Sequence, residues 1–351
     1  DRSFSVPSAL LSARALFLEG LDGTILTTAV PAIARDFGID AVDVSIALVA
    51  YLAAAAAGIP AAGWLADRFG VRKVLLLALA VFTAASLVCD VAPGLTVLTG
   101  ARVIQGLGGA LLVPVGRLAV IRGTDPKDLL DAIAFLTWPA LVAPVIAPLL
   151  GGLLADTIGW RWIFLLNVPL GIIAIIAGLF ILPKNTAVNV KRFDLPGFLG
   201  AMLVMVALTV AAELISRGSP AELTIAACLV LSAAVVCGFV VRWLRVPGRL
   251  FDLSIMRIPG FRVGNSSGSV YRLVITAAPF MFTLLFQVAF GWSATLAGAM
   301  VVALFAGNVG IKPFTTRIIR RWGFKAVLVF SNAIGGLVLA AFLFVGADTP
   351  L

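Results

Sequence analysis

The feature that most constrains this chain is a long series of apolar segments, each about 20 residues long and separated by short charged stretches. A helix of that length crosses the roughly 30 Å hydrocarbon core of a bilayer. Charged residues make up only 12% of the chain, about half the share of roughly 25% in soluble domains. We therefore expect an all-α integral membrane protein with about 11 transmembrane helices. The expected helices are residues 12–34, 44–65, 73–92, 97–120, 132–155, 162–182, 196–215, 222–242, 268–290, 295–316 and 325–346.

The lysine and arginine residues predict how these helices are oriented. Of the 26 basic residues, 21 lie at the N-terminus or in loops after even-numbered segments, whereas loops after odd-numbered segments hold only Arg35, Arg161 and Arg217. Cytoplasmic loops of membrane proteins carry the excess of positive charge. The pattern predicts a cytoplasmic N-terminus, and it explains the net charge of +9 without nucleic-acid binding.

The composition excludes several kinds of chemistry. The chain has no histidine, so imidazole catalysis and histidine metal sites are absent. Its three cysteines, Cys89, Cys228 and Cys237, form no C-x-x-C pair and predict neither a zinc site nor a redox pair. No phosphate-binding loop of the form G-x-x-x-x-G-K-[ST] is present. We expect no enzyme activity, no cofactor and no metal.

One charged connection carries a recognisable motif. Residues 63–73 read Gly-Trp-Leu-Ala-Asp-Arg-Phe-Gly-Val-Arg-Lys, which resembles the loop signature of the major facilitator superfamily. A degraded copy occurs at 321–327, with Arg320 at the position of Asp67. The copies lie farther apart than the roughly 180–200 residues of a six-helix half. Two additional helices, at about 196–242, are therefore expected between the halves.

Further segments narrow the resemblance to one branch. They are Leu-Asp-Gly-Thr-Ile at 21–25, Arg-Val-Ile-Gln-Gly-Leu-Gly-Gly-Ala at 102–110, Ala-Pro-Val-Ile-Ala-Pro-Leu-Leu-Gly-Gly at 143–152, and Asn-Val-Pro at 167–169. Together they resemble the fourteen-helix drug:proton antiporters of the multidrug efflux type. The resemblance implies the major facilitator fold, with two helix bundles around a central cavity and alternating access driven by proton uptake.

The resemblance also implies a domain organisation. Residues 1–182 would form an N-terminal six-helix bundle, and residues 183–261 a two-helix insert with flanking cytoplasmic loops. Residues 262–351 would supply three helices of an incomplete C-terminal bundle. Because the family pattern has six helices after the insert, the chain is expected to be C-terminally truncated and unable to transport by itself.

Two acidic residues of the first segment are candidates for proton coupling. A carboxylate at membrane depth is costly unless it is paired or in contact with water, so Asp22 and Glu19 are functional candidates. Counting along the helices places Arg102 within reach of Asp22. We predict that protonation of Asp22, which burial favours, releases Arg102 during transport; a static ion pair is the alternative. Glu19 either binds a cationic drug or only lines the cavity.

The motif at 63–73 predicts a cytoplasmic latch. Its glycines permit a tight turn between two helices, and Asp67 can pair with a neighbouring arginine near a helix N-terminus. A plain solvated turn is the alternative. The latch residues are Gly63, Asp67, Arg68, Gly70 and Arg72.

The fifth segment carries small residues at four-residue spacing together with two prolines. Such a face allows close helix approach, and proline permits bending. The segment would form either a tight, leak-proof interface that favours exchange or an ordinary packing surface with kinks. Its motif residues are Ala143, Pro144, Ala147, Pro148, Gly151 and Gly152.

Two further polar residues are candidates for the cavity. Gln105 belongs to the motif of the fourth segment, and Arg272 is the charged residue within the ninth. Arg272 either faces the cavity or extends its side chain toward the cytoplasm.

These observations predict a proton-coupled antiporter that exports lipophilic or cationic small molecules and drugs across the plasma membrane. Export of one specific metabolite on the same scaffold is an alternative, as is a truncated membrane protein that does not transport. The expected partners are the substrate, protons and the lipid bilayer, with the proton gradient as energy source. We expect the inner membrane of a bacterium. Periplasmic adaptor proteins are a further class of partner that the sequence does not identify.

Overall fold

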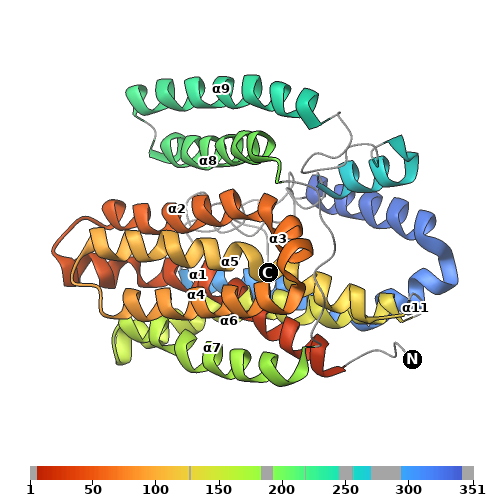
Figure 1. The fold of residues 1–351 in the computed structure, drawn as a ribbon, viewed down its shortest axis with the longest axis horizontal. Coiled ribbons are helices and arrows are strands. Elements are labelled where there is room, and N and C mark those ends of the chain that lie inside the picture. The colour runs from red at the N-terminus through yellow and green to blue at the C-terminus, as the bar shows by residue number, and fades with distance from the viewer. Residues whose placement is uncertain are drawn as a thin grey trace. The chain divides into compact units, whose positions relative to one another are not determined.

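The computed structural model describes residues 6–125, 128–182, 193–217, 219–244, 255, 257–269 and 294–341. Within these ranges every regular element is a helix, as the sequence predicted (Figure 1). The chain divides into two compact units, Asp1–Ser254 and Ile255–Leu351. The first unit covers the ranges predicted for the N-terminal bundle and for the two insert helices, and that division stays a prediction.

The helices of the first unit begin and end within a few residues of most predicted boundaries. Glycine or a charged residue stands at several ends, for example Gly94 before α5 and Gly70 between α3 and α4. The elements are α1 (Val6–Phe37), α2 (Ala41–Gly58), η1 (Ile59–Ala61), α3 (Ala62–Phe69), α4 (Val71–Asp90), α5 (Leu95–Gly123), α6 (Leu129–Thr157), α7 (Arg161–Ile181), α8 (Leu195–Arg217) and α9 (Pro220–Leu244).

The second predicted segment, 44–65, is interrupted in the structure. The helix changes to a short 3₁₀ turn at Ile59–Ala61 and then continues as α3 to Phe69. Pro60 lies in this turn, and proline lacks the N–H that a helix interior requires. The sequence predicted one continuous helix over 44–65 and did not predict this break.

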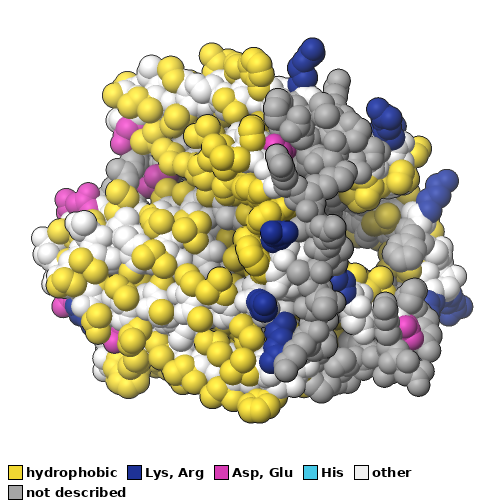
Figure 2. Space-filling view, viewed as in Figure 1, with side chains coloured by type: hydrophobic (Ala, Val, Ile, Leu, Met, Phe, Trp, Pro, Cys, Tyr) yellow, Lys and Arg dark blue, Asp and Glu magenta, His cyan; other side chains and the backbone are white. Residues whose placement is uncertain are grey.

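Six of the described helical segments are long and apolar enough to cross a membrane: Asp43–Phe69, Val71–Asp90, Leu95–Gly123, Arg161–Ile181, Leu195–Ile215 and Pro220–Arg242. Many large apolar side chains on them are exposed, among them Leu77, Phe180 and Phe239. Figure 2 shows such side chains across the visible face. Exposed apolar bands on helices of this length are what a lipid-facing surface requires.

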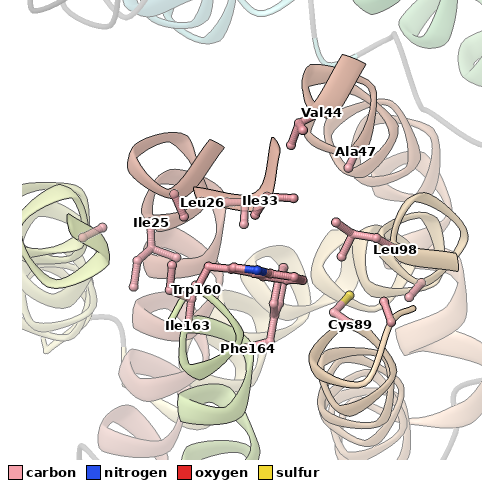
Figure 3. Packing of buried hydrophobic residues seen from close by; sticks show 14 of the residues in the cluster. Ile25, Leu26, Ile33, Val44, Ala47, Cys89, Leu98, Trp160, Ile163 and Phe164 are labelled. Carbon is pink, nitrogen blue, oxygen red and sulfur yellow. The ribbon is translucent and has the colours of Figure 1, made fainter. Parts of the chain in front are cut away.

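The core of the first unit is formed where its helices meet. Helix α1 packs along α6, α5 packs against both α2 and α4, and α7 packs against α4. One buried cluster unites Ile33 of α1, Leu98 of α5 and Phe164 of α7, together with Trp160 at the start of α7 (Figure 3). These contacts place the inner faces of α1, α2, α4, α5 and α7 against one another.

Helices α8 and α9 form an antiparallel pair beside this core. Helix α8 packs against α9 and α2, and the pair lies at the α2 side of the unit, away from α7 (Figure 1). The Ser45 hydroxyl of α2 donates a hydrogen bond to Glu213 of α8 at 2.9 Å. Helices α8 and α9 thus lie on one side of the other helices of this unit, in the range predicted for the two-helix insert; their assignment as an insert stays a prediction.

The second unit contains a helix at 259–269 and α11 (Ala294–Ala341). The helix at 259–269 lies mostly between the predicted helices 222–242 and 268–290, where no helix was predicted. The predicted helices 295–316 and 325–346 follow each other directly in α11, with a kink at Gly323, whose φ is 77°. Most of the predicted helix 268–290, including Arg272, lies outside the described residues.

The repeated motif gives the same backbone conformation in both copies. Gly70 has φ 87° and ψ 142°, and Gly323 has φ 77° and ψ 158°. Backbone of this kind is essentially restricted to glycine. The structure thus supports the equivalence of segments 63–73 and 321–327 that the sequence indicated.

Candidate functional site

The centre of the site is an ion pair between α1 and α5. Arg102 Nη1 lies 2.5 Å from Asp22 Oδ2. The side chain of Asp22 is 1% exposed and that of Arg102 is fully buried. The structure thus brings together the two residues that the sequence placed at similar depth, while their role in coupling stays a prediction.

Gln105 joins both members of the pair, one helical turn after Arg102. Its Oε1 accepts a hydrogen bond from Arg102 Nη1 at 2.7 Å, and its Nε2 donates to Asp22 Oδ1 at 3.0 Å. The same Nε2 donates to Ser86 Oγ of α4 at 2.7 Å. Gln105 is fully buried, so it belongs to this network and not to an open surface.

Asn167 of α7 is a further member of the site that sequence reasoning missed. Its Nδ2 donates to Asp22 Oδ1 at 2.7 Å, and its side chain is fully buried. The available signal was an amide side chain within an otherwise apolar span, because polar residues at membrane depth are functional candidates. In the sequence, the motif at 167–169 indicated only the family.

Aromatic rings surround the other side of Arg102. Its Cζ lies 3.9 Å from the ring centroid of Tyr51 on α2 and 5.8 Å from that of Phe164 on α7. Arg102 Nε and Nη2 have no hydrogen-bond partner among the described residues. A guanidinium over aromatic rings gains cation–π attraction, which partly replaces the missing hydrogen bonds.

Close packing between α5 and its neighbours holds this arrangement. A Cβ atom on Gly106 would lie 2.5 Å from the Tyr51 carbonyl oxygen and 2.9 Å from the Ala54 Cβ. Only glycine allows α5 to approach α2 so closely at this position. The glycine that follows Gln105 in the motif therefore places Arg102 against the ring of Tyr51.

Glu19 lies one helical turn before Asp22 and near the hydroxyl of Tyr51. A Cβ on Gly109 of α5 would lie 3.1 Å from Tyr51 Oη and 3.8 Å from Glu19 Cγ. Glu19 also interacts electrostatically with Asp22 and Arg117. The structure places Glu19 beside the ion pair. The two alternatives for its role, binding a cationic drug or only lining the cavity, stay predictions.

The latch motif forms contacts at the end of α3. Asp67 is ion-paired with Arg122 at the end of α5, on a half-exposed surface, and not with the adjacent Arg68. Arg72 Nη2 donates to the Leu179 carbonyl oxygen of α7 at 2.6 Å. The motif thus connects the ends of four helices, α3 with α5 and α4 with α7, while a Cβ on Gly63 would meet nothing within 4 Å.

A second charged cluster joins α1, α7 and the connection between α4 and α5. Asp36 Oδ2 accepts hydrogen bonds from Arg161 Nη1 at 2.5 Å and from Trp160 Nε1 at 3.1 Å. Arg161 Nη2 also donates to the Ala92 carbonyl oxygen at 3.2 Å. The hydrogen bond from Arg161, followed by that from Trp160, lowers the pKa of Asp36 below its usual value. Asp36 lies beyond the predicted span 12–34.

The antiporter-motif residues lie on α6, which packs along α1. Ala143 and Ala147 are fully buried within the cluster that contains Ile25 and Ala29 of α1, and Gly151 is also buried. The side chains of Pro144 and Pro148, and Gly152, lie outside the described part of the structure. The small residues are therefore part of a close helix contact, as both alternatives for this segment require.

The comparisons with known proteins identify the family. A family model described as Major Facilitator Superfamily matches residues 14–351. Relatives with the provisional name multidrug resistance protein MdtD occur in Salmonella heidelberg (strain SL476) and Salmonella typhimurium (strain LT2). The first is 35% identical over 332 residues, which cover 95% of this chain and 70% of the relative. The second is 35% identical over 328 residues, covering 93% and 69%.

Solved structures share the fold at low sequence identity. The xylose transporter XylE from E. coli has a TM-score of 0.52 at 13% identity, covering 92% of this chain and 74% of XylE. The human organic anion transporter MFSD10 has a TM-score of 0.55 at 15% identity, covering 89% of this chain and 72% of that protein. At these identities the likeness concerns the fold.

Proposed function

The chain belongs to the major facilitator superfamily, and we propose that it functions as a proton-coupled antiporter that exports lipophilic or cationic small molecules. The observation that carries the proposal is the buried Asp22–Arg102 pair inside the first unit. The name of the MdtD relatives supports drugs as the class of substrate. Transport takes place by alternating access, the mode that the family resemblance implies.

The coupling step follows from the electrostatics of the pair. As a carboxylate, Asp22 neutralises Arg102 and accepts hydrogen bonds from Arg102, Gln105 and Asn167. Uptake of one proton makes Asp22 neutral and leaves the guanidinium without its counter-charge. A buried charge that has lost its partner costs about 3–5 kcal/mol, so the protonated state favours a helix rearrangement that gives Arg102 another partner or water.

Glu19 supplies the proposed link between substrate and proton. It lies one turn from Asp22 and beside Tyr51, so a cationic substrate near Glu19 would act electrostatically on the same pair. A cation there disfavours protonated carboxyls, because opposite charge stabilises the ionised form. Substrate binding and proton release are therefore coupled in the direction that exchange requires.

The two charged clusters are the proposed supports for the conformational change. The latch pair Asp67–Arg122 and the pair Asp36–Arg161 link helix ends on opposite sides of the predicted spans. Exposed pairs of this kind are each worth about 0–1 kcal/mol. They are weak enough to break and re-form during each cycle.

The proposal includes an inner-membrane location in a bacterium, with the N-terminus in the cytoplasm. The distribution of the basic residues supports this orientation. The organisms of the relatives support a bacterial membrane. Periplasmic adaptor proteins remain a proposed class of partner, and Arg272 a proposed cavity residue.

The test is ethidium efflux from cells that express the native protein, measured with and without a protonophore. We expect efflux above that of cells without the protein, and its loss when the protonophore collapses the proton gradient. Efflux that survives the protonophore would contradict proton coupling. Export of a single metabolite, with no response to ethidium or other lipophilic cations in a substrate panel, would support the alternative of a specific metabolite exporter.

A further inference from the structure

Of the two amide side chains that donate to Asp22, that of Asn167 has an oxygen without a hydrogen-bond partner among the described residues. Its Nδ2 donates to Asp22 Oδ1 at 2.7 Å, whereas its Oδ1 is buried without a hydrogen-bond partner among the described residues. A buried polar atom without a partner costs about 1–3 kcal/mol, and such atoms in native proteins call for an explanation.

Gln105, the other amide at Asp22, is held at both ends. Its Oε1 accepts from Arg102 Nη1 at 2.7 Å and from Cys89 Sγ at 3.8 Å. Its Nε2 donates to Ser86 Oγ at 2.7 Å as well as to Asp22 at 3.0 Å. Rotation of this amide by 180° would place N–H groups against the guanidinium, so Gln105 is fixed as a donor toward Asp22.

Protonation of Asp22 changes what its neighbours must supply. The carboxylate is an acceptor only, whereas a protonated carboxyl has one O–H donor and keeps acceptor capacity. Oδ2 faces the guanidinium donor of Arg102, so a proton on Oδ1 meets two amides, Gln105 and Asn167. An O–H at Oδ1 needs one of these two amides to become an acceptor.

We propose that Asn167 is the positioning residue that turns its amide when Asp22 is protonated, so that Asn167 Oδ1 accepts the new Asp22 O–H. The proposal rests on the proposed function, in which Asp22 carries the proton. One O–H bond forms at Asp22 Oδ1 and one O–H bond of a hydronium ion breaks, leaving water. The remaining lone pair of Oδ1 still accepts the Gln105 N–H.

Rotation of the Asn167 amide leaves the number of its atoms without a hydrogen-bond partner unchanged. Before protonation its buried Oδ1 lacks a partner among the described residues, and after the turn its Nδ2 occupies that position. The penalty for one unpaired amide atom is therefore present in both states and largely cancels. Asn167 stabilises the ionised and the protonated form of Asp22 in turn. Compared with an amide that is fixed as a donor, it lowers the free energy of the protonated form, which the transport cycle must also visit.

Other groups that act on Asp22 belong to several helices. On α1 itself the nearby titratable group is Glu19, which also interacts with Arg117. The described α6 side chains Ala143 and Ala147, packed against α1, are apolar. Among the described residues of the remaining helices, the titratable groups that interact with Asp22 are Tyr51 of α2, Cys89 of α4 and its ion-pair partner Arg102 of α5.

The direct test is an infrared difference spectrum of the purified native protein between high and low pH, with ¹³C-labelled asparagine side chains. Protonation should shift one asparagine carbonyl band to the lower frequency of a hydrogen-bonded carbonyl. The shift should be absent in Asn167→Leu and in Asp22→Asn, and present in Ile163→Leu, a buried apolar control one turn earlier on α7. The proposal would be overturned if the shift persisted in Asn167→Leu. It would also be overturned if the native protein formed the band of a protonated Asp22 carboxyl without any shift of an asparagine band.

A second readout is the pH midpoint of proton release when ethidium is added. Asn167→Leu removes a hydrogen-bond donor from the ionised form of Asp22 and an acceptor from the protonated form. The bond to the charged carboxylate is the stronger of the two, so the midpoint of proton release should move upward by about one pH unit or less. Asn167→Ser, whose hydroxyl both donates and accepts, should restore part of the shift. An unchanged midpoint in Asn167→Leu, with proton release still lost in Asp22→Asn, would reject the role of Asn167 alone. Full proton-driven export by Asp22→Asn would reject the proposed function instead.

Discussion

Arg102 is the residue on which most contacts of the site converge. It pairs with Asp22 and Gln105 through one nitrogen and stacks on the ring of Tyr51 through its planar face. A lysine has no planar group and no fork of donors. The site therefore depends on arginine and not on positive charge alone.

Removing one member of the pair should cost more than removing both. We expect Arg102→Leu to lower the free energy of unfolding by about 3–5 kcal/mol, because Asp22 is left buried without its partner. Combining it with Asp22→Asn should recover part of that loss. Thermal unfolding in detergent measures both variants. A double variant that is no more stable than Arg102→Leu would contradict this account of the pair.

How far the site follows from sequence differs from residue to residue. Asp22 and Arg102 were predicted because charged residues within apolar spans are rare and need a reason. Asn167 was missed because its partner lies on a helix far away in sequence, and a lone amide predicts no particular contact. The pairing of Asp67 with Arg122 was only partly predicted, because the choice among several arginines depends on where the ends of α3 and α5 meet.

At the scale of helices, the motif that begins at Arg102 serves packing as well as chemistry. Gly106 brings α5 against the backbone of α2, and this contact sets the position of Arg102 over Tyr51. Helix positions were predicted well because apolar periodicity and length determine them. Hydropathy does not predict local backbone geometry. It therefore predicted neither the break at Ile59–Ala61 nor the kink at Gly323, where two expected helices follow each other directly.

The contact at Gly106 gives a prediction for stability. We expect Gly106→Ala to destabilise the protein by about 1–3 kcal/mol, because the added methyl group would overlap the Tyr51 carbonyl and the helices must separate. Gly100→Ala is the matched control on the same helix, since a Cβ there meets nothing within 4 Å; it should be neutral or stabilising by about 0.5–1 kcal/mol. Thermal unfolding distinguishes the two, and equal effects would refute the packing argument.

A pH dependence follows from the cluster at the ends of α1 and α7. Since Arg161 and Trp160 lower the pKa of Asp36 in the folded protein, the ion pair contributes its full stability above the unfolded value of about 3.9. The contribution is lost as the pH falls through the lower folded value. Because the pair is exposed, the effect should be small and reduced by salt.

The measurement is the difference in unfolding temperature between the native protein and Asp36→Asn, followed from pH 7 to below pH 3. We expect the difference to be constant at neutral pH and to vanish at the acidic end. A difference that grows on acidification would mean that Asp36 is not stabilised as a carboxylate.

At the scale of the whole molecule, the first unit carries the proposed proton site and both charged clusters at its helix ends. Chemistry at one carboxyl group can therefore act on the contacts that hold the helices together. The sequence predicted the membrane class and the family. Substrate identity could not be predicted in the same way, because fold alone does not determine what a transporter binds.

The measurement that tests the central claim most directly is ethidium accumulation in proteoliposomes driven by an imposed pH gradient, comparing the native protein with Asp22→Asn. The variant Gly100→Ala, in which the added Cβ meets nothing within 4 Å, is the control and should accumulate ethidium as the native protein does. We predict that Asp22→Asn still equilibrates ethidium down its own gradient but shows no accumulation driven by the pH gradient. Accumulation by Asp22→Asn equal to that of the native protein would contradict the role of the Asp22–Arg102 pair in proton coupling.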